Sequence, residues 1–198
     1  MSAEAYLVLP TFAQPLELHT KRCMLRQWKD SDLPAWAAMN ADAEVRRYFP
    51  SVASVEQALG EAQRCRDAIA QRGWGMWALE VPGVMPFAGF VGLNAPHYDA
   101  PWIPAVEIGW RLTRAAWGLG LATEGAKAAL DFGFTHLKLR EIVAITVPAN
   151  TPSRRVMARL GMVRDEAGDF DHPRIEAGHA LQRHVLYRAQ QRLATAPD

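Results

Sequence analysis

The sequence contains only two cysteines, no apolar run long enough to span a membrane and almost no excess of either charge. Cys23 and Cys65 lack the spacing of a zinc site or a redox pair, so we expect buried, reduced thiols and no metal site. There is no tract of about 18 apolar residues and no charged-then-apolar leader, so we expect a cytoplasmic protein with no membrane partner. The 22 Lys and Arg residues balance 21 Asp and Glu residues, and a net charge of +1 argues against nucleic acid as a partner.

Internal repeats and linker-like runs are also absent. The 198 residues, 49% hydrophobic and 22% charged, fit one domain with a full core. We expect that domain over residues 16–188, with an N-terminal arm over residues 1–15 and a C-terminal tail over residues 189–198. Alternating strand-like and helical stretches predict a mixed α/β sheet of about seven strands with about four helices on its faces.

The expected elements follow from apolar periodicity, caps and turn residues. The predicted strands cover residues 16–28, 74–80, 86–93, 106–112, 140–147, 163–168 and 180–188. The predicted helices follow Asp30 or Ser31, run from Ser54 to about Gln71, and cover residues 122–134 and 151–160. Residues 94–104 hold three prolines and should form a surface loop.

A strand, a glycine turn and a helix follow one another over residues 106–134. The turn, Gly118-Leu119-Gly120, lets the chain bend sharply and brings backbone amides close to a bulky anion. A helix N-terminus beside such a turn can bind phosphate, although Gly-x-Gly before a helix is also common in ordinary turns. No Gly-Lys-Ser/Thr follows and the three-glycine dinucleotide fingerprint is absent, so two familiar phosphate motifs can be set aside.

A second motif lies downstream, where a β-branched run is followed by Asn150-Thr151-Pro152-Ser153 and then by Leu160-Gly161-Met162. Together with the form Trp-Gly-x-Gly-x-Ala-Thr-Glu over residues 117–124, it resembles the GNAT superfamily of acyl-CoA-dependent N-acetyltransferases. Within that superfamily the chain looks most like the ribosomal-protein Nα-acetyltransferase (Rim-type) branch. The resemblance extends loosely over residues 16–188. It implies a mostly antiparallel sheet and acetyl-CoA as the cofactor.

The resemblance also implies which residues hold the cofactor. Backbone amides of the glycine turn would bind the pyrophosphate, and amides of the central strand would polarise the thioester carbonyl. The implied cofactor contacts are Trp110, Leu112, Trp117, Gly118, Leu119, Gly120, Leu121, Ala122, Thr123, Asn150 and Ser153. The family usually has Gln or Arg at the position of Ala115, and Arg114 is a candidate cation in its place.

Glu107 is the candidate catalytic base, acting directly or through water. A carboxylate in an apolar cleft can have its pKa raised toward the range in which it deprotonates an amine. The alternative is a structural ion pair with Arg111 on the same strand face. Relatives often carry an acidic Tyr at the position of Met157, which cannot donate a proton. Ser153 could bind the leaving thiolate instead, or it could contact the cofactor arm or cap the backbone.

The acceptor side is indicated only by aromatic residues and one histidine. We expect Trp28, Trp36, Trp74 and His97 to bind a substrate amine, either a protein N-terminus or a small amine, with the protein a monomer or homodimer. Since neither cysteine lies in a motif, direct attack without a covalent intermediate is expected. The alternative function is a catalytically silent acyl-CoA-binding sensor or interaction module.

Overall fold

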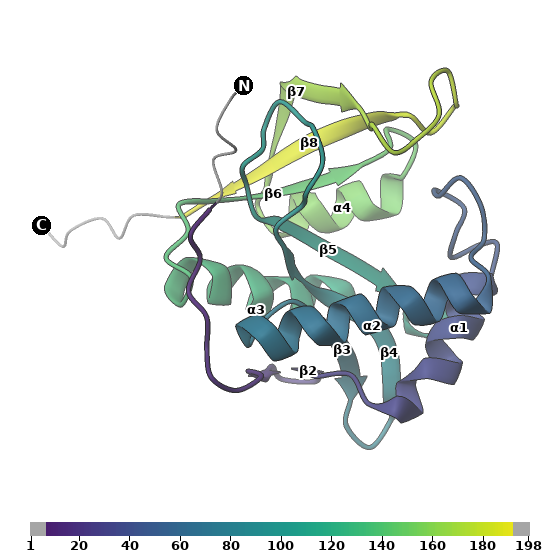
Figure 1. Ribbon diagram of the computed structural model, residues 1–198, viewed down its shortest axis with the longest axis vertical. Helices are drawn as coiled ribbons and strands as arrows, with labels where there is room; N and C mark the ends of the chain where they lie inside the picture. The colour runs from purple at the N-terminus through teal and green to yellow at the C-terminus, as the bar shows by residue number, and fades with distance from the viewer. Residues whose placement is uncertain (1–6, 192–198) are drawn as a thin grey trace, which may run out of the picture.

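The computed structural model describes residues 7–191. These residues form one eight-stranded sheet in the order β1-β2-β3-β4-β5-β6-β8-β7, with four α-helices packed on it (Figure 1). The strands are β1 Leu18–His19, β2 Met24–Arg26, β3 Met76–Val81, β4 Met85–Asn94, β5 Glu107–Leu112, β6 Glu141–Thr146, β7 Val163–Asp171 and β8 Arg183–Gln190. The helices are α1 Leu33–Ala41, α2 Val55–Arg72, α3 Leu121–Thr135 and α4 Thr151–Arg159, with short 3₁₀ turns at Asp30–Asp32 and Arg114–Ala116.

The sheet is antiparallel except where β5 pairs with β6. The expected mixed, mostly antiparallel α/β fold is therefore confirmed. The described sheet has eight strands instead of about seven because residues 16–28 form a hairpin and not one strand. A tight turn, in which the Thr20 amide donates to the Cys23 carbonyl at 2.9 Å and the Thr20 hydroxyl accepts from the Cys23 amide at 2.8 Å, separates β1 from β2.

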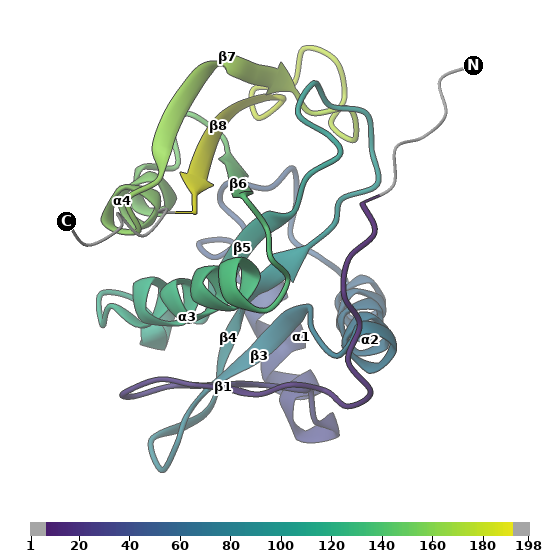
Figure 2. The ribbon, with the colours of Figure 1, turned by 90° about the vertical axis from the view of Figure 1, so that its left-hand side faces the viewer.

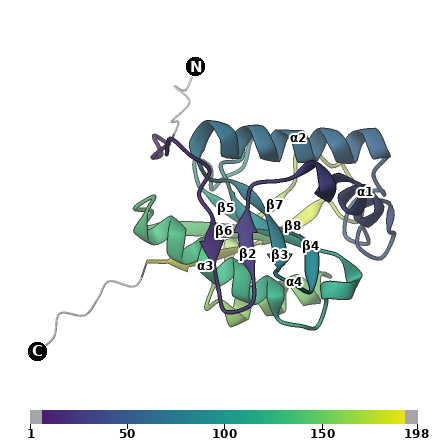
Figure 3. The ribbon, with the colours of Figure 1, turned by 90° about the horizontal axis from the view of Figure 1, so that it is seen from below.

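The helices cover both faces of the sheet. Figure 3 shows α1 and α2 on one face and α3 and α4 on the other. Helix α2 starts at a capping box between Ser54 and Gln57 and ends at Gly73, whose φ of 80° is left-handed. A side chain at Gly73 would place its Cβ 2.7 Å from the Phe12 Cβ, so the end of α2 is packed against residues before β1. Among the described helices, none combines the length and apolar character that crossing a membrane requires.

Residues 7–15, the described part of the expected N-terminal arm, lie against the end of α2. The Phe12 amide donates to the Arg72 carbonyl at 2.9 Å, and the Trp74 indole donates to the Pro10 carbonyl at 2.9 Å. Residues 1–6 and the end of the expected tail lie outside the described residues, and β8 continues to Gln190.

The sheet opens between its two parallel strands. Strand β5 has six register pairs with β4 but a single pair with β6, between Glu107 and Val143. Figure 2 shows β6, β8 and β7 turning away from β3, β4 and β5 beyond this point. The divergence leaves one edge of β5 without a partner strand beyond Ile108.

Candidate active site

The glycine turn after β5 has the conformation of an anion-binding loop. Gly118 and Gly120 have φ values of 73° and 78°, in the left-handed region that favours glycine. Gly120 is also the N-cap of α3 and no side chain caps that helix, whose first bond runs from the Glu124 amide to the Gly120 carbonyl at 3.1 Å. The amides of Leu121, Ala122 and Thr123 therefore precede the helical hydrogen bonds, which is the arrangement that binds phosphate at a helix N-terminus.

The hairpin between β1 and β2 holds this turn in place. Glu124 accepts hydrogen bonds from the Thr20 hydroxyl, the Arg22 amide and the Arg22 Nε, each at 2.7 Å. Arg22 also donates from Nη1 to the Leu119 carbonyl at 2.9 Å. Burial raises the pKa of Glu124, but the hydrogen bonds from Thr20 and Arg22 outweigh it and lower that pKa overall. Glu124 thus anchors the turn, and Arg22 puts a cation beside it that sequence analysis missed.

Arg114, the cation that the sequence analysis expected at this turn, lies at the opposite end of the 3₁₀ turn. Its guanidinium is exposed and stands 3.8 Å from the Asp42 carboxylate. Trp117 and Leu119 are about half exposed, and the Trp117 indole donates to the Leu112 carbonyl at 2.9 Å. The Trp117 ring is therefore fixed to the end of β5 at the mouth of the opened strand edge.

The opened edge of β5 presents specific backbone amides. Alternate residues of a strand direct their hydrogen-bonding groups to opposite neighbours. The Val143 amide donates to the Val106 carbonyl at 2.9 Å, so the even-numbered residues of β5 face β6. The amides of Trp110 and Leu112 consequently face the side from which β6 has diverged, as the sequence analysis expected for the donors that polarise a carbonyl.

Asn150 and Ser153 sit at the start of α4, across the opening from β5. The Asn150 Oδ1 accepts from the Ser153 amide at 3.2 Å, and its Nδ2 donates to the Thr146 hydroxyl at 2.9 Å. Asn150 is thus the helix cap, and Ser153 takes part in the cap through its backbone amide. Met157 is 1% exposed. This position packs in the core, where a methionine fits and a proton donor would have no solvent contact.

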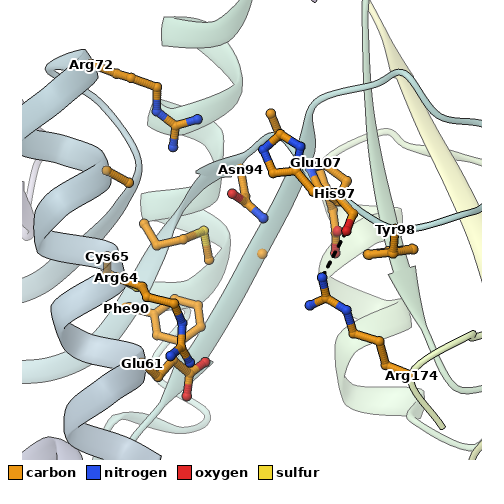
Figure 4. A pocket seen from close by; sticks show the side chains of 15 residues that line it. Glu61, Arg64, Cys65, Arg72, Phe90, Asn94, His97, Tyr98, Glu107 and Arg174 are labelled. Atoms are coloured by element: carbon orange, nitrogen blue, oxygen red, sulfur yellow. Dashed lines mark hydrogen bonds between the residues drawn. The ribbon is translucent and has the colours of Figure 1, made fainter. Parts of the chain in front are cut away.

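A cavity of about 410 Å³ lies between α2, the ends of β4 and β5, residues 95–98 and the loop between β7 and β8 (Figure 4). Its charged lining residues are Glu61, Arg64, Arg72, Glu107 and Arg174. Three of these come from α2 at helical spacing, so one helix face supplies much of the wall. Of the residues expected to bind substrate, only His97 lines this cavity.

Glu107 is the cavity carboxylate whose pKa is raised into the neutral range by its surroundings. Burial raises the pKa of its carboxyl group from 4.5 to about 7. The alternative ion pair with Arg111 is wrong, because Arg111 donates to Glu61 at 3.1 and 3.2 Å and to the Asn40 Oδ1 at 2.6 Å. Glu61 is therefore occupied by a cation. Glu107 remains as the carboxylate that can exchange a proton near neutral pH.

The three tryptophans expected at the acceptor site are core residues instead. Trp28 is 3% exposed and Trp36 and Trp74 are fully buried. Their indole N–H groups donate to the carbonyls of Met76, Ala58 and Pro10 at 2.7, 2.7 and 2.9 Å. Since a large ring gains more from burial when its polar atom has a partner, these side chains stabilise the fold and do not line the cavity.

Sequence analysis identified only Glu107 and His97 among the cavity residues, and those it missed include Arg64, Arg72, Tyr98 and Arg174. Tyr98 lies close enough to Glu107 for their charges to interact, and burial together with Glu107 raises the pKa of its hydroxyl. Arg174 donates to the His97 carbonyl at 3.0 Å and so connects the two loops (Figure 4). The spacing of residues 61, 64, 65, 68 and 72 on one helix face was the available signal for the α2 residues, whereas nothing local links Arg174 to them.

A glycine turn at an uncapped helix start, next to an opened strand pair on a mostly antiparallel sheet with helices on both faces, is the arrangement that the resemblance to acyl-CoA-dependent transferases implies. Comparison with known proteins identifies the family. The model of the acetyltransferase (GNAT) domain matches residues 22–163, and the chain belongs to this family. It is an acetyl-CoA-dependent N-acetyltransferase.

Individual relatives agree with the family assignment. The chain is 30% identical over 155 residues to the uncharacterized N-acetyltransferase p20 of Bacillus licheniformis, covering 75% of this chain and 85% of that protein. An acetyltransferase (GNAT family) from Bacillus anthracis has a TM-score of 0.72 at 26% identity, covering 88% of this chain and 98% of that one. Mycobacterium smegmatis RimJ, solved in complex with CoA-disulfide, has a TM-score of 0.68 at 24% identity, covering 89% of this chain and 88% of that one.

Proposed function

We propose that this protein acetylates a primary amine by direct attack on acetyl-CoA, with Glu107 as the general base. The observation that carries the proposal is the carboxyl group of Glu107, which lies in the cavity beside the opened edge of β5 and has a pKa of about 7. A base with that pKa is deprotonated in half of the molecules at neutral pH and still binds a proton well. The acceptor is a small amine or, as in the Rim-type branch, a protein N-terminus.

The residues around the glycine turn fit the phosphate portion of coenzyme A. A Cβ built on Gly118 meets nothing within 4 Å, so the turn is open to a ligand, and the uncapped start of α3 offers amides to an anion. We assign pyrophosphate binding to the backbone of residues 117–122, with the Thr123 hydroxyl nearby. Arg22 lies at the same place, but its charge is balanced by the Glu124 carboxylate, so the backbone amides supply the attraction for the anion.

The remaining roles follow from position. When bound, acetyl-CoA supplies an acetyl group activated as a thioester. The Trp110 and Leu112 amides would hold the acyl oxygen, and one such donor contributes about 3 kcal/mol to stabilising the negative charge that develops on it. Glu107 accepts the proton that the amine loses, directly or through water. Asn150 and Ser153 border the cofactor arm, and we assign the Ser153 hydroxyl to the leaving thiolate.

A catalytically silent acyl-CoA sensor is the competing function. The sensor function is disfavoured because the pKa of Glu107 is raised to about 7 and Glu107 forms no ion pair with Arg111, which bonds Glu61 instead. A thiol-release assay with acetyl-CoA over a panel of primary amines separates the two functions, with coenzyme A binding measured in parallel by calorimetry. Turnover on at least one amine is expected. Coenzyme A binding without turnover on any amine would support the sensor.

The glycine turn can be tested by adding a side chain to it. Gly118→Val should raise the dissociation constant for coenzyme A at least about tenfold, because a β-branched residue disfavours positive φ and shields the amides. Gly83→Val is a matched control, since Gly83 has a φ of 72°, and a Cβ there also meets nothing within 4 Å. Both variants should lose similar stability in urea unfolding. Equal coenzyme A affinity in the two variants would remove the turn from the binding site.

A further inference from the structure

We infer that the acceptor cavity binds a small amine that also carries a carboxylate, that is, a molecule of the amino-acid type. This inference rests on the proposed function, in which the amine is acetylated beside Glu107. It specifies a second functional group of the acceptor besides the amine, namely an anionic group that is recognised by arginines on the cavity wall.

The cavity has a surplus of positive charge. Within residues 7–191, no carboxylate lies at ion-pair distance from Arg64, Arg72 or Arg174. The carboxylate of Glu61 is held by Arg111 and does not offset them. An arginine keeps its charge at all ordinary pH values and matches a carboxylate with paired donors. Three such groups on one cavity therefore favour an anionic ligand.

Two buried atoms at the cavity are hydrogen-bond donors without a partner. The Arg72 Nε and the Tyr98 hydroxyl are both shielded from solvent, and neither has a hydrogen-bond partner in the described chain. Burial lowers the pKa of Arg72, as expected for a cation that lacks a counterion. Arg72 is therefore a desolvated cation without a counterion at the cavity wall, which favours an anion beside it.

The arginine side chains are positioned for this role from different elements. Arg72 ends α2, and its guanidinium lies 4.3 Å from the Trp74 ring centroid, so one face is packed against the ring while the edge stays free. Arg174 comes from the loop between β7 and β8 and is fixed by its hydrogen bond to the His97 carbonyl. Figure 4 shows the Arg174 guanidinium beside His97 and Glu107, and the Arg72 guanidinium on the other side of the cavity at the end of α2.

The size of the cavity favours a small molecule over a protein N-terminus. A volume of about 410 Å³ is at the lower end of ordinary ligand pockets, which hold about 300–1,000 Å³. The Arg174 to His97 bond joins the two loops that border it. An amino acid fits with its amine at Glu107 and its carboxylate at the arginines, whereas a peptide chain would have to continue out of the cavity past these loops.

The test compares amino acids with their carboxamides in the thiol-release assay, after correction for the ionisation of each amine. Each carboxylate should be used with a kcat/KM about tenfold to a hundredfold above that of its amide, the range of a charge-assisted hydrogen bond. Arg72→Gln and Arg174→Gln should remove most of this preference by raising KM for the carboxylates only. Arg66→Gln, on the same helix but bonded to Asp30 outside the cavity, is the control and should keep it.

Binding is measured separately so that failure of the enzyme function does not hide the answer. Equilibrium dialysis of the same amino acids and amides against the coenzyme A complex should show the same preference, lost in Arg72→Gln. If amides bind and react as well as acids, or if short acidic peptides are preferred to free amino acids, the inference is overturned. If no amine reacts but the carboxylates still bind selectively, the inference stands and the proposed function fails.

Discussion

Glu107→Gln should lower kcat about 10²- to 10³-fold, the loss expected when a positioned general base is removed. Glutamine has nearly the same shape but cannot accept a proton from the attacking amine. The amides of Trp110 and Leu112 and the glycine turn are untouched, so coenzyme A affinity should stay within about twofold of the parent value. Glu166→Gln, at an exposed position on β7, is the matched control and should keep full activity.

The pH dependence gives this prediction a second readout. Because the pKa of Glu107 is about 7, kcat/KM of the parent should rise with pH through that region, in addition to the rise caused by ionisation of the amine itself. The other titratable or charged groups that line the same cavity are Glu61, Arg64, Cys65, Arg72, His97, Tyr98 and Arg174. In Glu107→Gln the step near pH 7 should disappear while the step of the amine remains. An unchanged profile would remove Glu107 as the base.

The Glu107→Gln variant, which should lose activity, should be more stable than the parent at alkaline pH. A carboxyl group whose pKa is 4.5 in the unfolded chain and about 7 in the folded protein binds more protons when folded between these two values. Its stabilising effect is therefore lost as the pH rises through that window, and burial of the charged form destabilises the fold above it. Glu107→Gln should unfold at a higher temperature than the parent at pH 8, and at a similar temperature below pH 4.5.

The glycine turn and its helix could be predicted because their signal is contiguous. The turn, the helix start and the neighbouring strand lie within residues 106–134. Gly118 and Gly120 have positive φ, a conformation that glycine adopts readily, so the residue type itself indicates the turn. The alternation of β5 indicated a half-buried strand that carries Glu107, whereas the opening beside the amides of Trp110 and Leu112 was implied only by the family resemblance. Whether these groups bind acetyl-CoA and act in catalysis remains a prediction.

The acceptor cavity could not be predicted because its walls come from distant parts of the chain. Arg72 and Arg174 are about a hundred residues apart, and only the packing of α2 and the β7–β8 loop around the end of β5 brings them to one cavity. An ion pair between Arg111 and Glu107 on the same strand was the alternative that the sequence left open, but Glu61 of α2 bonds Arg111 instead. A long charged side chain pairs with an opposite charge that is close in space, and the spacing of residues in the sequence does not show which charge that is.

The tryptophan prediction was wrong for a related reason. Aromatic residues upstream of the cofactor motif were expected at the acceptor site, but a buried indole contributes both apolar area and a satisfied N–H group to the fold. Trp28 and Trp36 meet edge to face with ring centroids 5.0 Å apart, and Phe87 and Phe90 continue this cluster under α1. Periodicity could not separate this packing from a ligand pocket.

A charged residue that is buried away from the cavity connects several strands of the fold. Arg26 of β2 is 2% exposed and uses all five of its N–H donors. Two go to Asp32 at 2.8 and 2.9 Å, one goes to Glu80 of β3, and the other two go to the carbonyls of Gln27 and Pro86 at 3.0 and 2.8 Å. The Arg26 side chain therefore connects β2 to β3, to β4 and to the segment that precedes α1.

Arg26→Met should lower the free energy of unfolding by about 3–5 kcal/mol, the cost of leaving a buried charge without its partner. Asp32, also 2% exposed, would keep only the Lys29 amide as a donor to its carboxylate, at 2.8 Å. Lys29→Met is the matched control, because Lys29 is exposed and contacts Glu80 at 3.4 Å, and such a surface pair contributes less than about 1 kcal/mol. Urea unfolding at pH 7 measures both.

The double variant distinguishes a lost ion pair from a lost packing contact. Asp32→Asn combined with Arg26→Met removes the uncompensated charge, so the two changes together should cost less than the sum of their separate effects. The hydrogen bond from Arg26 lowers the pKa of Glu80, so its contribution is present above the ordinary pKa of 4.5 and is lost as the pH falls. The gap between the parent and Arg26→Met should therefore narrow on acidification below pH 4.5. Strict additivity and a gap independent of pH would mean that Arg26 acts through its volume, with its charge making no difference.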